Sequence, residues 1–418
     1  MIALVDVNNF YVSCERLFNP KLLNKPVVVL SNNDGCIISR SNEAKLLDIK
    51  MGTPLFKIKN LIKVSSIKVL SSNYPLYADI SNRTMTVLGS FSPRQEIYSI
   101  DECFLDLSGN RDLYAIGQTI KKKLWQYLDM PVCVGIAPTK TLAKLANYCA
   151  KKQPSWSGVC DLSKLSTIRI DNIMSKINVS EVWGIGNKTS DKLNSIGVYS
   201  VLDLKKSDAI CMKKKFSINL EKIIYELNKT ICFPIEPKIP LKKQIVTSRS
   251  FGRPIQRYNL LVEAITTFTS RAAYKSRQQN TLAEYVSVFI SSSPFQKKPY
   301  FYQNIITLKL PYLTSDTNFI LSIALEGLKS IYKANIKYTK CGIILSGLAD
   351  KHRSQDYLWP IENIERSQLT KVIDNINFKF DKQSVRFATQ PLSPIWEMKQ
   401  SRKSQSFTTS WKELLVVN

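Results

Sequence analysis

Three acidic residues draw attention because they interrupt apolar sequence. Asp6 follows the apolar run 2–5, and Asp101 and Glu102 break the stretch 98–107. Carboxylates gathered at one place repel each other unless cations neutralise them, and hard oxygen ligands of this kind select Mg²⁺. Two such ions suit phosphoryl transfer, in which they activate an attacking 3′ hydroxyl and stabilise a departing pyrophosphate. Neighbouring side chains on a regular strand face opposite ways, so Asp101 and Glu102 converge only at a turn or bulge. Spacing alone leaves open that these are solvated acids at strand ends.

The rest of the composition removes most other catalytic chemistry. His352 is the sole histidine, so neither a Ser-His-Asp triad nor a histidine-rich metal site can form. The nine cysteines are scattered singly without a C-x-x-C pair, which favours small core residues in a reducing cytoplasm over disulfides or a zinc site. If the protein is an enzyme, carboxylates, lysines, hydroxyls or a metal must act.

The charge of the chain predicts a polyanionic partner. The 418 residues include 59 Lys and Arg against 33 Asp and Glu, a formal net charge of +26. Nucleic acid is the commonest partner of so basic a chain, and the alternatives are an anionic membrane surface or a charge that serves only solubility. No uncharged apolar run of about 18 residues is present, so we expect a cytoplasmic protein without a membrane partner. At about 150 residues per domain, the length suggests roughly three domains.

The elements that must position the acids can be read from hydrophobic pattern. Short apolar runs at 2–5, 26–30 and 132–136 predict buried strands, and helical patterns follow at 112–128 and 139–152. This mixture of strands and helices indicates an α+β domain.

The segment 181–204 has the pattern of a helix-hairpin-helix. Gly184 and Gly186 form a Gly-x-Gly turn ahead of a helix that begins near Lys188. Glycines let backbone N–H groups approach a phosphate, and the helix N-terminus adds a favourable dipole. An ordinary connection between helices is the alternative interpretation.

A proline-rich stretch separates this region from a strongly basic module. Pro234, Pro237 and Pro240 predict an extended tether. The order of patterns beyond it, β-α-β-β-α-β, is that of a split βαβ, ferredoxin-like domain. Residues 238–310 contain twelve Lys or Arg against two acids, a large share of the excess charge. After about Ala349 we expect a polar, irregular contact tail.

Five segments in order resemble the motifs of one protein family. They are DVNNFYVSCE at 6–15, SNNDGCIISRSNEAK at 31–45, SNYPLYADISNR at 72–83, YSIDE at 98–102 and GIAPTKTLAKLAN at 135–147. Together they resemble the Y-family DNA polymerases, and within them the UmuC-type catalytic subunits of bacterial DNA polymerase V. The similarity continues through the hairpin and the basic module to about residue 348.

The resemblance implies an α+β right-hand fold with a palm, fingers, a helix-hairpin-helix thumb and a ferredoxin-like little finger. The expected boundaries are a palm at 1–165 with fingers inserted at about 20–75, a thumb at 166–232, a tether at 233–243, a little finger at 244–348 and a partner-contact tail at 349–418.

The resemblance also implies roles for individual residues. The catalytic, metal-binding carboxylates are Asp6, Asp101 and Glu102, with the Val7 carbonyl as a further ligand to two Mg²⁺ ions. Tyr11 matches the steric gate that stacks under the sugar and excludes a 2′ hydroxyl. The positions that hold the triphosphate of the incoming dNTP are Ser39, Lys45 and Lys151, where cations offset developing charge. Two residues depart from many relatives, which have a tyrosine at Asn42 and often an acid at Asn8.

Contacts with macromolecules follow from the same resemblance. The residues expected on the backbone of primer-template DNA, without reading sequence, are Gly184, Gly186, Lys188, Lys242, Lys243, Arg249 and Arg253. A short motif resembling the peptide that binds the bacterial sliding clamp has as its anchors Gln355, Leu358 and Trp359. The segment 396–418 is expected to contact a processed UmuD-type dimer and a RecA filament.

Three functions are compatible with these features to different degrees. The first is an error-prone, template-directed DNA polymerase that acts in translesion synthesis and SOS mutagenesis. The second is a DNA-binding accessory protein that keeps the fold without catalysis, although such a protein has no need to concentrate acids near DNA phosphates. The third is a template-independent nucleotidyltransferase, which a duplex-gripping thumb does not favour.

Overall fold

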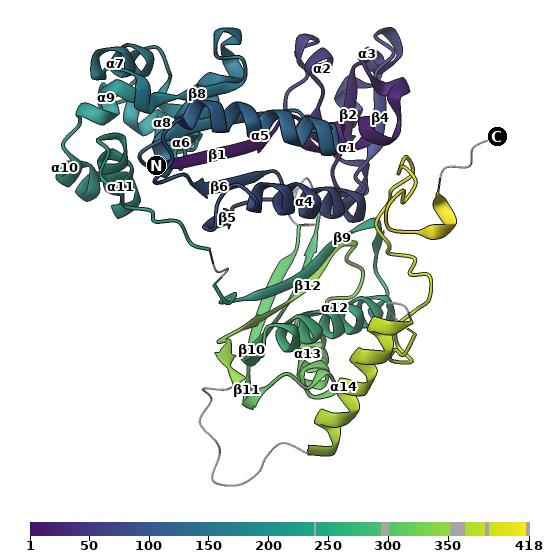
Figure 1. Cartoon of the computed structure of the whole chain (residues 1–418). Helices are drawn as coiled ribbons and strands as arrows, with labels where there is room; N and C mark the ends of the chain where they lie inside the picture. The colour runs from purple at the N-terminus through teal and green to yellow at the C-terminus, as the bar shows by residue number, and fades with distance from the viewer. Residues whose placement is uncertain (238–239, 294–300, 352–363, 381–383, 415–418) are drawn as a thin grey trace. The chain divides into compact units, whose positions relative to one another are not determined.

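The structure is a computed structural model that describes residues 1–237, 240–293, 301–351, 364–380 and 384–414 (Figure 1). The chain forms two compact units. Unit 1 comprises Met1–Ser31, Cys36–Ile239 and Arg402–Asn418, and unit 2 comprises Asn32–Gly35 and Pro240–Ser401. The boundary between 239 and 240 falls inside the segment expected to be a tether.

Unit 1 is built on a five-stranded sheet. Its strand order is β5 (Gln95–Ile97), β6 (Glu102–Asp106), β1 (Ile2–Val7), β7 (Val132–Ala137) and β8 (Val159–Asp161). β1 is antiparallel to both of its neighbours, and all six of its residues are buried. A central strand covered on both faces needs apolar residues along most of its length, which explains the apolar run 2–5. Asp6 is the one acid in β1 and lies next to the strand's last residue, Val7.

The two faces of this sheet are covered by different helices. Ala3 and Val5 share a hydrophobic cluster with residues of α1 (Phe10–Phe18), α4 (Tyr74–Gly89) and α5 (Leu113–Leu128). Ile2, Leu4 and Phe104 belong to a second cluster with α6 (Lys140–Lys152) and the helices that follow it. Because strand side chains alternate between faces, the parity of a residue in β1 or β6 decides which helices it meets.

A smaller three-stranded sheet follows α1 along the chain. Its order is β3 (Ile37–Arg40), β2 (Val27–Leu30) and β4 (Lys68–Ser71), accompanied by α2 (Asn42–Leu46) and α3 (Lys59–Val64). β2 is fully buried and contributes Val28 and Leu30 to a separate small core. This sheet corresponds to the segment expected to form the fingers.

Five helices follow the large sheet: α7 (Thr167–Ser175), α8 (Asn187–Asn194), α9 (Val201–Lys206), α10 (Ala209–Lys215) and α11 (Ile218–Leu227). A buried carboxylate, Glu226 of α11, fastens them to α6. It accepts hydrogen bonds from the backbone N–H and hydroxyl of Thr141 at 2.9 and 2.8 Å, and from the N–H groups of Cys232 and Phe233. Four donors satisfy a charge that would be costly to bury alone.

Unit 2 has the predicted β-α-β-β-α-β order. Its elements are β9 (Ile245–Ile255), α12 (Tyr258–Gln278), β10 (Thr281–Ser292), β11 (Gln303–Thr314), α13 (Thr317–Ile331) and β12 (Tyr338–Ser346). The sheet order is β11-β10-β12-β9, with the short β13 (Ala349–Asp350) added to β10. Each helix joins two strands that have a third strand between them, which is the split βαβ arrangement.

The expectation of an irregular tail after Ala349 is wrong in two places. Ile364–Lys379 forms helix α14, and Trp396 is only 4% exposed, packed at the core of unit 2 against Phe251 and Phe268. A helix with a weak apolar stripe and a single buried tryptophan leave little periodic signal in sequence.

The cysteines and the helices bear on two further expectations from the sequence. All nine cysteines are free, as their scattered spacing predicts. None of the helices in the described ranges is both long enough and apolar enough to span a bilayer.

Candidate active site

Two of the three predicted catalytic acids face each other across neighbouring strands. Asp6 of β1 pairs in register with Glu102 of β6. Asp6 has the same parity as Leu4, and Glu102 the same parity as Phe104, so both carboxylates lie on the face of the sheet that α6 covers.

Helix α6 presents a lysine to each of these acids. Lys144 and Lys151 are seven residues apart, about two turns, and therefore lie on one face of the helix. The Lys144 ammonium lies 2.9 Å from both carboxylate oxygens of Glu102, and the Lys151 ammonium lies 2.6 Å from Oδ2 of Asp6. The predicted triphosphate-binding Lys151 is thus ion-paired with a predicted metal ligand.

Aromatic rings surround the Lys144 ammonium. It lies 4.4 Å from the ring centre of Tyr98, 5.5 Å from that of Trp183 and 5.8 Å from that of Phe104. Ring faces attract a cation, so this cage fixes Lys144 and through it the orientation of Glu102. Sequence analysis did not assign Lys144 a role, although it belongs to the 135–147 motif.

The third acid, Asp101, lies in a turn. The stretch 98–107 is not one interrupted strand: residues 98–101 form the turn of a hairpin that joins β5 to β6. The backbone carbonyl of Asp101 accepts a hydrogen bond from the N–H of Val7 at 3.0 Å, and its Oδ1 accepts one from the Ser99 hydroxyl at 2.6 Å. The turn therefore places Asp101 beside the end of β1, where Asp6 also lies.

The electrostatics of Asp6 reflect a crowded group of acids. The pKa of Asp6 is raised to about 7, chiefly by burial and also by repulsion from Glu102 and Asp101, whereas the ion pair and hydrogen bond with Lys151 act in the lowering direction. An extra positive charge would relieve this repulsion, and the oxygen donors present are those that Mg²⁺ prefers. The donor set fits a divalent cation.

The side chains of Asp6, Asp101 and Glu102 are not arranged as a set of metal ligands in this structure. Within the ranges that the structure describes, no three His, Cys, Asp or Glu side chains are grouped so as to hold a metal ion. Asp6 and Glu102 each bind a lysine instead. Metal binding by Asp6, Val7, Asp101 and Glu102 therefore stays a prediction.

The predicted steric gate, Tyr11, stands near the start of α1. The helix begins after Asn9, whose backbone is left-handed with φ of 50°, a conformation that asparagine tolerates well. The Tyr11 ring stacks on Tyr77 with ring centres 4.5 Å apart and planes 17° from parallel. Its edge contact with Tyr74 has a centroid distance of 6.1 Å. Burial raises the pKa of Tyr11, and the charges of Tyr74 and Asp101 raise it further.

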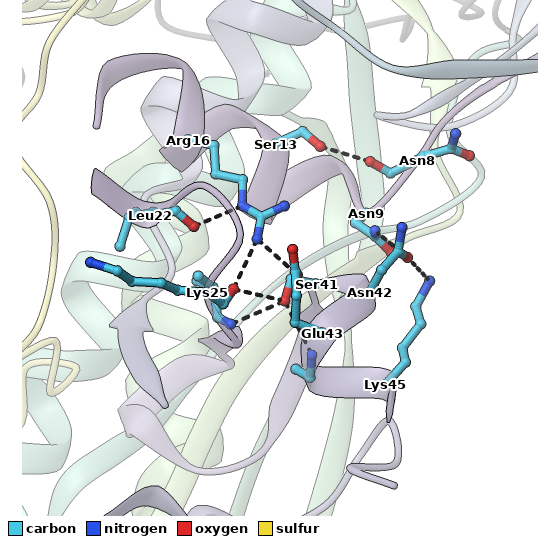
Figure 2. Close-up of polar contacts among 12 residues, drawn as sticks. Asn8, Asn9, Ser13, Arg16, Leu22, Lys25, Ser41, Asn42, Glu43 and Lys45 are labelled. Atoms are coloured by element: carbon cyan, nitrogen blue, oxygen red, sulfur yellow. Dashed lines mark hydrogen bonds and ion pairs between the residues drawn. The ribbon is translucent and has the colours of Figure 1, made fainter. Parts of the chain in front are cut away.

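Figure 2 shows how the short helix α2 is fastened beside this site. Oδ1 of Asn42 accepts hydrogen bonds from Asn9 at 3.1 Å and from the Lys45 ammonium at 3.3 Å. The Ser39 hydroxyl donates to the carbonyl of Asn9 at 3.4 Å. Asn42 thus orients Lys45, which gives a physical role to a residue that differs from many relatives.

Several cations converge at this place. Loss of hydration lowers the pKa of Lys45, and repulsion from Arg40, Lys151 and Lys152 lowers it further, whereas Asp6 raises it. The guanidinium of Arg40 donates to the carbonyl of Ile49, while its Nε is buried without a partner. Such mutual repulsion indicates a site prepared for a polyanion. Arg40 lies inside the 31–45 motif but was not singled out from sequence.

The predicted helix-hairpin-helix has the expected turn. Gly184 adopts φ of +86°, and Gly186 is the residue before α8, with open space where a Cβ would be. Gly184, Gly186 and Lys188 are all exposed. Backbone N–H groups at the start of α8 are therefore accessible to a phosphate.

The basic residues predicted on unit 2 are also exposed, and they have unpredicted neighbours. Lys242, Lys243, Arg249 and Arg253 all lie on the surface. Partial burial lowers the pKa values of Arg271 and Lys275, and repulsion from Arg249 lowers both further, with Lys242 acting on Lys275 as well. Strand β9 and the helix α12 that follows it thus combine into one cationic surface. The three residues predicted to bind the sliding clamp, Gln355, Leu358 and Trp359, lie outside the described residues.

Comparison with known proteins agrees with this architecture. The chain matches the model of the impB/mucB/samB family at residues 5–148, the C-terminal domain of that family at 242–358, and its HHH motif at 169–198. Residues 367–417 match a domain of unknown function, DUF4113.

Relatives and solved structures extend the comparison. The chain is 41% identical to Protein UmuC of Salmonella typhimurium, with all of both chains covered. It is 31% identical to DNA polymerase IV of Saccharolobus solfataricus over 49% of this chain and 58% of that protein. A Y-family DNA polymerase chimera of Dbh and Dpo4 superposes with a TM-score of 0.64 at 22% identity, covering 83% of this chain and 99% of that one. The chain therefore belongs to the impB/mucB/samB family and has the fold of the Y-family DNA polymerases.

Proposed function

We propose that the protein is an error-prone translesion DNA polymerase that adds dNTPs to a primer 3′ end as directed by a template. The observation that supports this most strongly is the convergence of three elements in unit 1: the paired acids Asp6 and Glu102, the stacked gate Tyr11, and the cations around Lys45. Full-length similarity to UmuC supports the same function.

In the reaction, the primer 3′ oxygen attacks the α-phosphorus of the dNTP. A new P–O bond forms, the bond between the α- and β-phosphates breaks, and pyrophosphate leaves while the hydroxyl proton is released. Lys45, Arg40 and Lys151 bind the triphosphate and offset the charge that grows on the leaving group. Tyr11 lies flat against Tyr77. As the proposed gate, its ring would stack under the deoxyribose and exclude a 2′ hydroxyl.

The acids Asp6, Asp101 and Glu102, with the Val7 carbonyl, are the residues that would hold two Mg²⁺ ions. When bound, these ions would supply the Lewis-acid chemistry that polarises both the attacking and the departing oxygen. Lys151, which is paired with Asp6 in this structure, would be available to bind the triphosphate if a cation neutralised Asp6.

Partners follow from the proposed reaction. Primer-template DNA binds the exposed hairpin of α8 and the cationic surface of unit 2 through its phosphates. A processed UmuD-type dimer, RecA and the sliding clamp are proposed as protein partners by analogy with the UmuC branch. Because DNA is the substrate, we place the protein in the cytoplasm.

Primer extension past an abasic site tests the proposal. We expect extension by the wild type with Mg²⁺, in the presence of UmuD-type and RecA partners, and none by Asp101→Asn. Asp129→Asn is the matched control, because Asp129 is exposed at the end of α5 with φ of 50°, which asparagine tolerates. Equal extension by wild type and Asp101→Asn, or none by either, would contradict the proposal.

A further inference from the structure

The C-terminal segment Arg402–Glu413 belongs to unit 1, although the chain before it belongs to unit 2. It lies in the region that matches a domain of unknown function. The segment begins with a reciprocal pair of hydrogen bonds. The N–H of Ser71 donates to the carbonyl of Arg402 at 2.9 Å, and the N–H of Arg402 donates to the Ser71 hydroxyl at 3.0 Å. It is therefore fastened at the end of β4, just before α4.

Two further contacts fix the middle of the segment. The side-chain amide of Asn73 donates to the Ser404 hydroxyl at 2.9 Å and to the carbonyl of Gln405 at 3.1 Å. The ring of Phe407 stacks on Phe18, the last residue of α1, with ring centres 4.8 Å apart and planes 9° from parallel. The segment thus bridges the start of α4 and the end of α1, the two helices that contribute the stacked tyrosines.

Between these anchors, the segment contacts a buried acid. Glu15 of α1 is 2% exposed. Its Oε1 accepts hydrogen bonds from the Tyr77 hydroxyl at 2.7 Å and from the Ser404 hydroxyl at 3.1 Å. Burial raises the pKa of Glu15, and both hydrogen bonds lower it. A buried carboxylate needs such donors, so Ser404 is part of what keeps Glu15 in place.

Glu15 in turn holds the ring that supports the gate. Tyr77 is fully buried, and its hydroxyl donates a hydrogen bond to Glu15. Tyr11 stacks on Tyr77. Contacts therefore run without a break from Ser404 through Glu15 and Tyr77 to Tyr11.

We propose that the C-terminal segment Arg402–Glu413 sets the position of the sugar gate, with Ser404 as a positioning residue that acts on Tyr11 through Glu15 and Tyr77. The inference rests on the proposed polymerase function. A well-held Tyr77 gives Tyr11 a rigid support against which a 2′ hydroxyl clashes. When the support loosens, Tyr11 can tilt and admit a ribonucleotide, whereas a deoxyribonucleotide fits in either case.

The test compares sugar selection in the full chain of the wild type, Ser404→Ala, Ser404→Thr and Thr409→Ala. Thr409 is the matched control, since it is an exposed hydroxyl residue in the same segment. For each protein, kcat/KM is measured for one dNTP and its rNTP on one primer-template. We expect Ser404→Ala to lower the dNTP-to-rNTP ratio by about three- to tenfold, through faster rNTP insertion, which is the size of effect expected for loss of one ordinary hydrogen bond. Ser404→Thr keeps the hydroxyl and should retain the wild-type ratio, as should Thr409→Ala.

A purely structural role for Ser404 predicts a different result. The kcat/KM values for dNTP and rNTP would then fall by the same factor, and an unchanged dNTP-to-rNTP ratio would overturn the inference. Hydrogen exchange gives a readout that does not depend on activity. Ser404→Ala should speed exchange in peptides from α1 and the start of α4, and unchanged exchange there would also overturn the inference. A wild type that inserts no dNTP would instead contradict the polymerase function, so the two failures can be told apart.

Discussion

Replacement of Lys45 by methionine should weaken the use of dNTP without changing the free energy of unfolding appreciably. Lys45 is repelled by Arg40, Lys151 and Lys152 in the free protein, and its direct partner is a neutral oxygen of Asn42 at 3.3 Å. A cation whose neighbours are mostly cations contributes little to stability. We therefore expect Lys45→Met to change the free energy of unfolding by no more than about 0.5 kcal/mol.

The effect on nucleotide use should be much larger. A hydrogen bond to a charged group contributes about 1.5–3 kcal/mol, so loss of one lysine-phosphate contact should lower kcat/KM for dNTP by about 10- to 150-fold. Binding of primer-template DNA should be unchanged, because the contact is with the incoming nucleotide.

Steady-state insertion of one nucleotide, with thermal unfolding of the same samples, measures both effects. Lys50→Met is the matched control, as another exposed lysine between β3 and β4. Two results would refute the reasoning. One is a kcat/KM equal to that of Lys50→Met, and the other is a loss of stability large enough to explain the loss of activity.

Three other predictions concern different parts of the chain. Burial raises the pKa of Glu15, so the folded state binds its proton more tightly than the unfolded state, and stability falls as pH rises above the ordinary pKa of 4.5. The melting temperature of Glu15→Gln minus that of the wild type should therefore increase from about pH 5 to about pH 8, and a difference independent of pH would contradict this prediction. The affinity for duplex DNA, measured by fluorescence anisotropy between about 50 and 200 mM salt, should depend less steeply on salt when four basic residues are neutralised together: Lys242, Lys243, Arg249 and Arg253. The slope of log affinity against log salt should fall in magnitude by up to about 3.6, and an unchanged slope would show that these residues do not contact phosphates. Capture of the chain by immobilised sliding clamp should be lost in the double variant Leu358→Ala, Trp359→Ala. It should be retained in the control Leu369→Ala, which alters an exposed leucine of α14. Equal capture of the double variant and the control would show that this motif does not bind the clamp.

Local pattern was enough to predict much of the fold. The predicted β-α-β-β-α-β order of the basic module is confirmed, and its first helix, α12, buries Leu261, Ile265 and Phe268 at helical spacing. Thr139 and Asp112 lie at the starts of their helices, and both accept a backbone hydrogen bond as N-caps. Signals of this kind depend on residues a few positions apart, which is why sequence alone reveals them.

The parts that sequence did not predict depend on contacts between distant residues. The pairing of Lys144 with Glu102 needs the parity of β6 and the position of α6 to be known together. Ser404 reaches Glu15 across 389 positions, and nothing in the polar segment around Ser404 marks it as a partner of a buried acid. The ion pair of Lys151 with Asp6 was likewise hidden, because the family motif assigns each residue to a different ligand.

Insertion of a single nucleotide opposite each of the four template bases tests the central claim most directly. The assay compares the wild type with Asp6→Asn, Asp101→Asn and Glu102→Gln, with Asp129→Asn as the control, on primer-template DNA with Mg²⁺. We predict that the wild type and Asp129→Asn insert nucleotides according to the template base, and that each of the three acid variants loses insertion. Insertion that ignores the template, or that persists in the acid variants, would contradict the account.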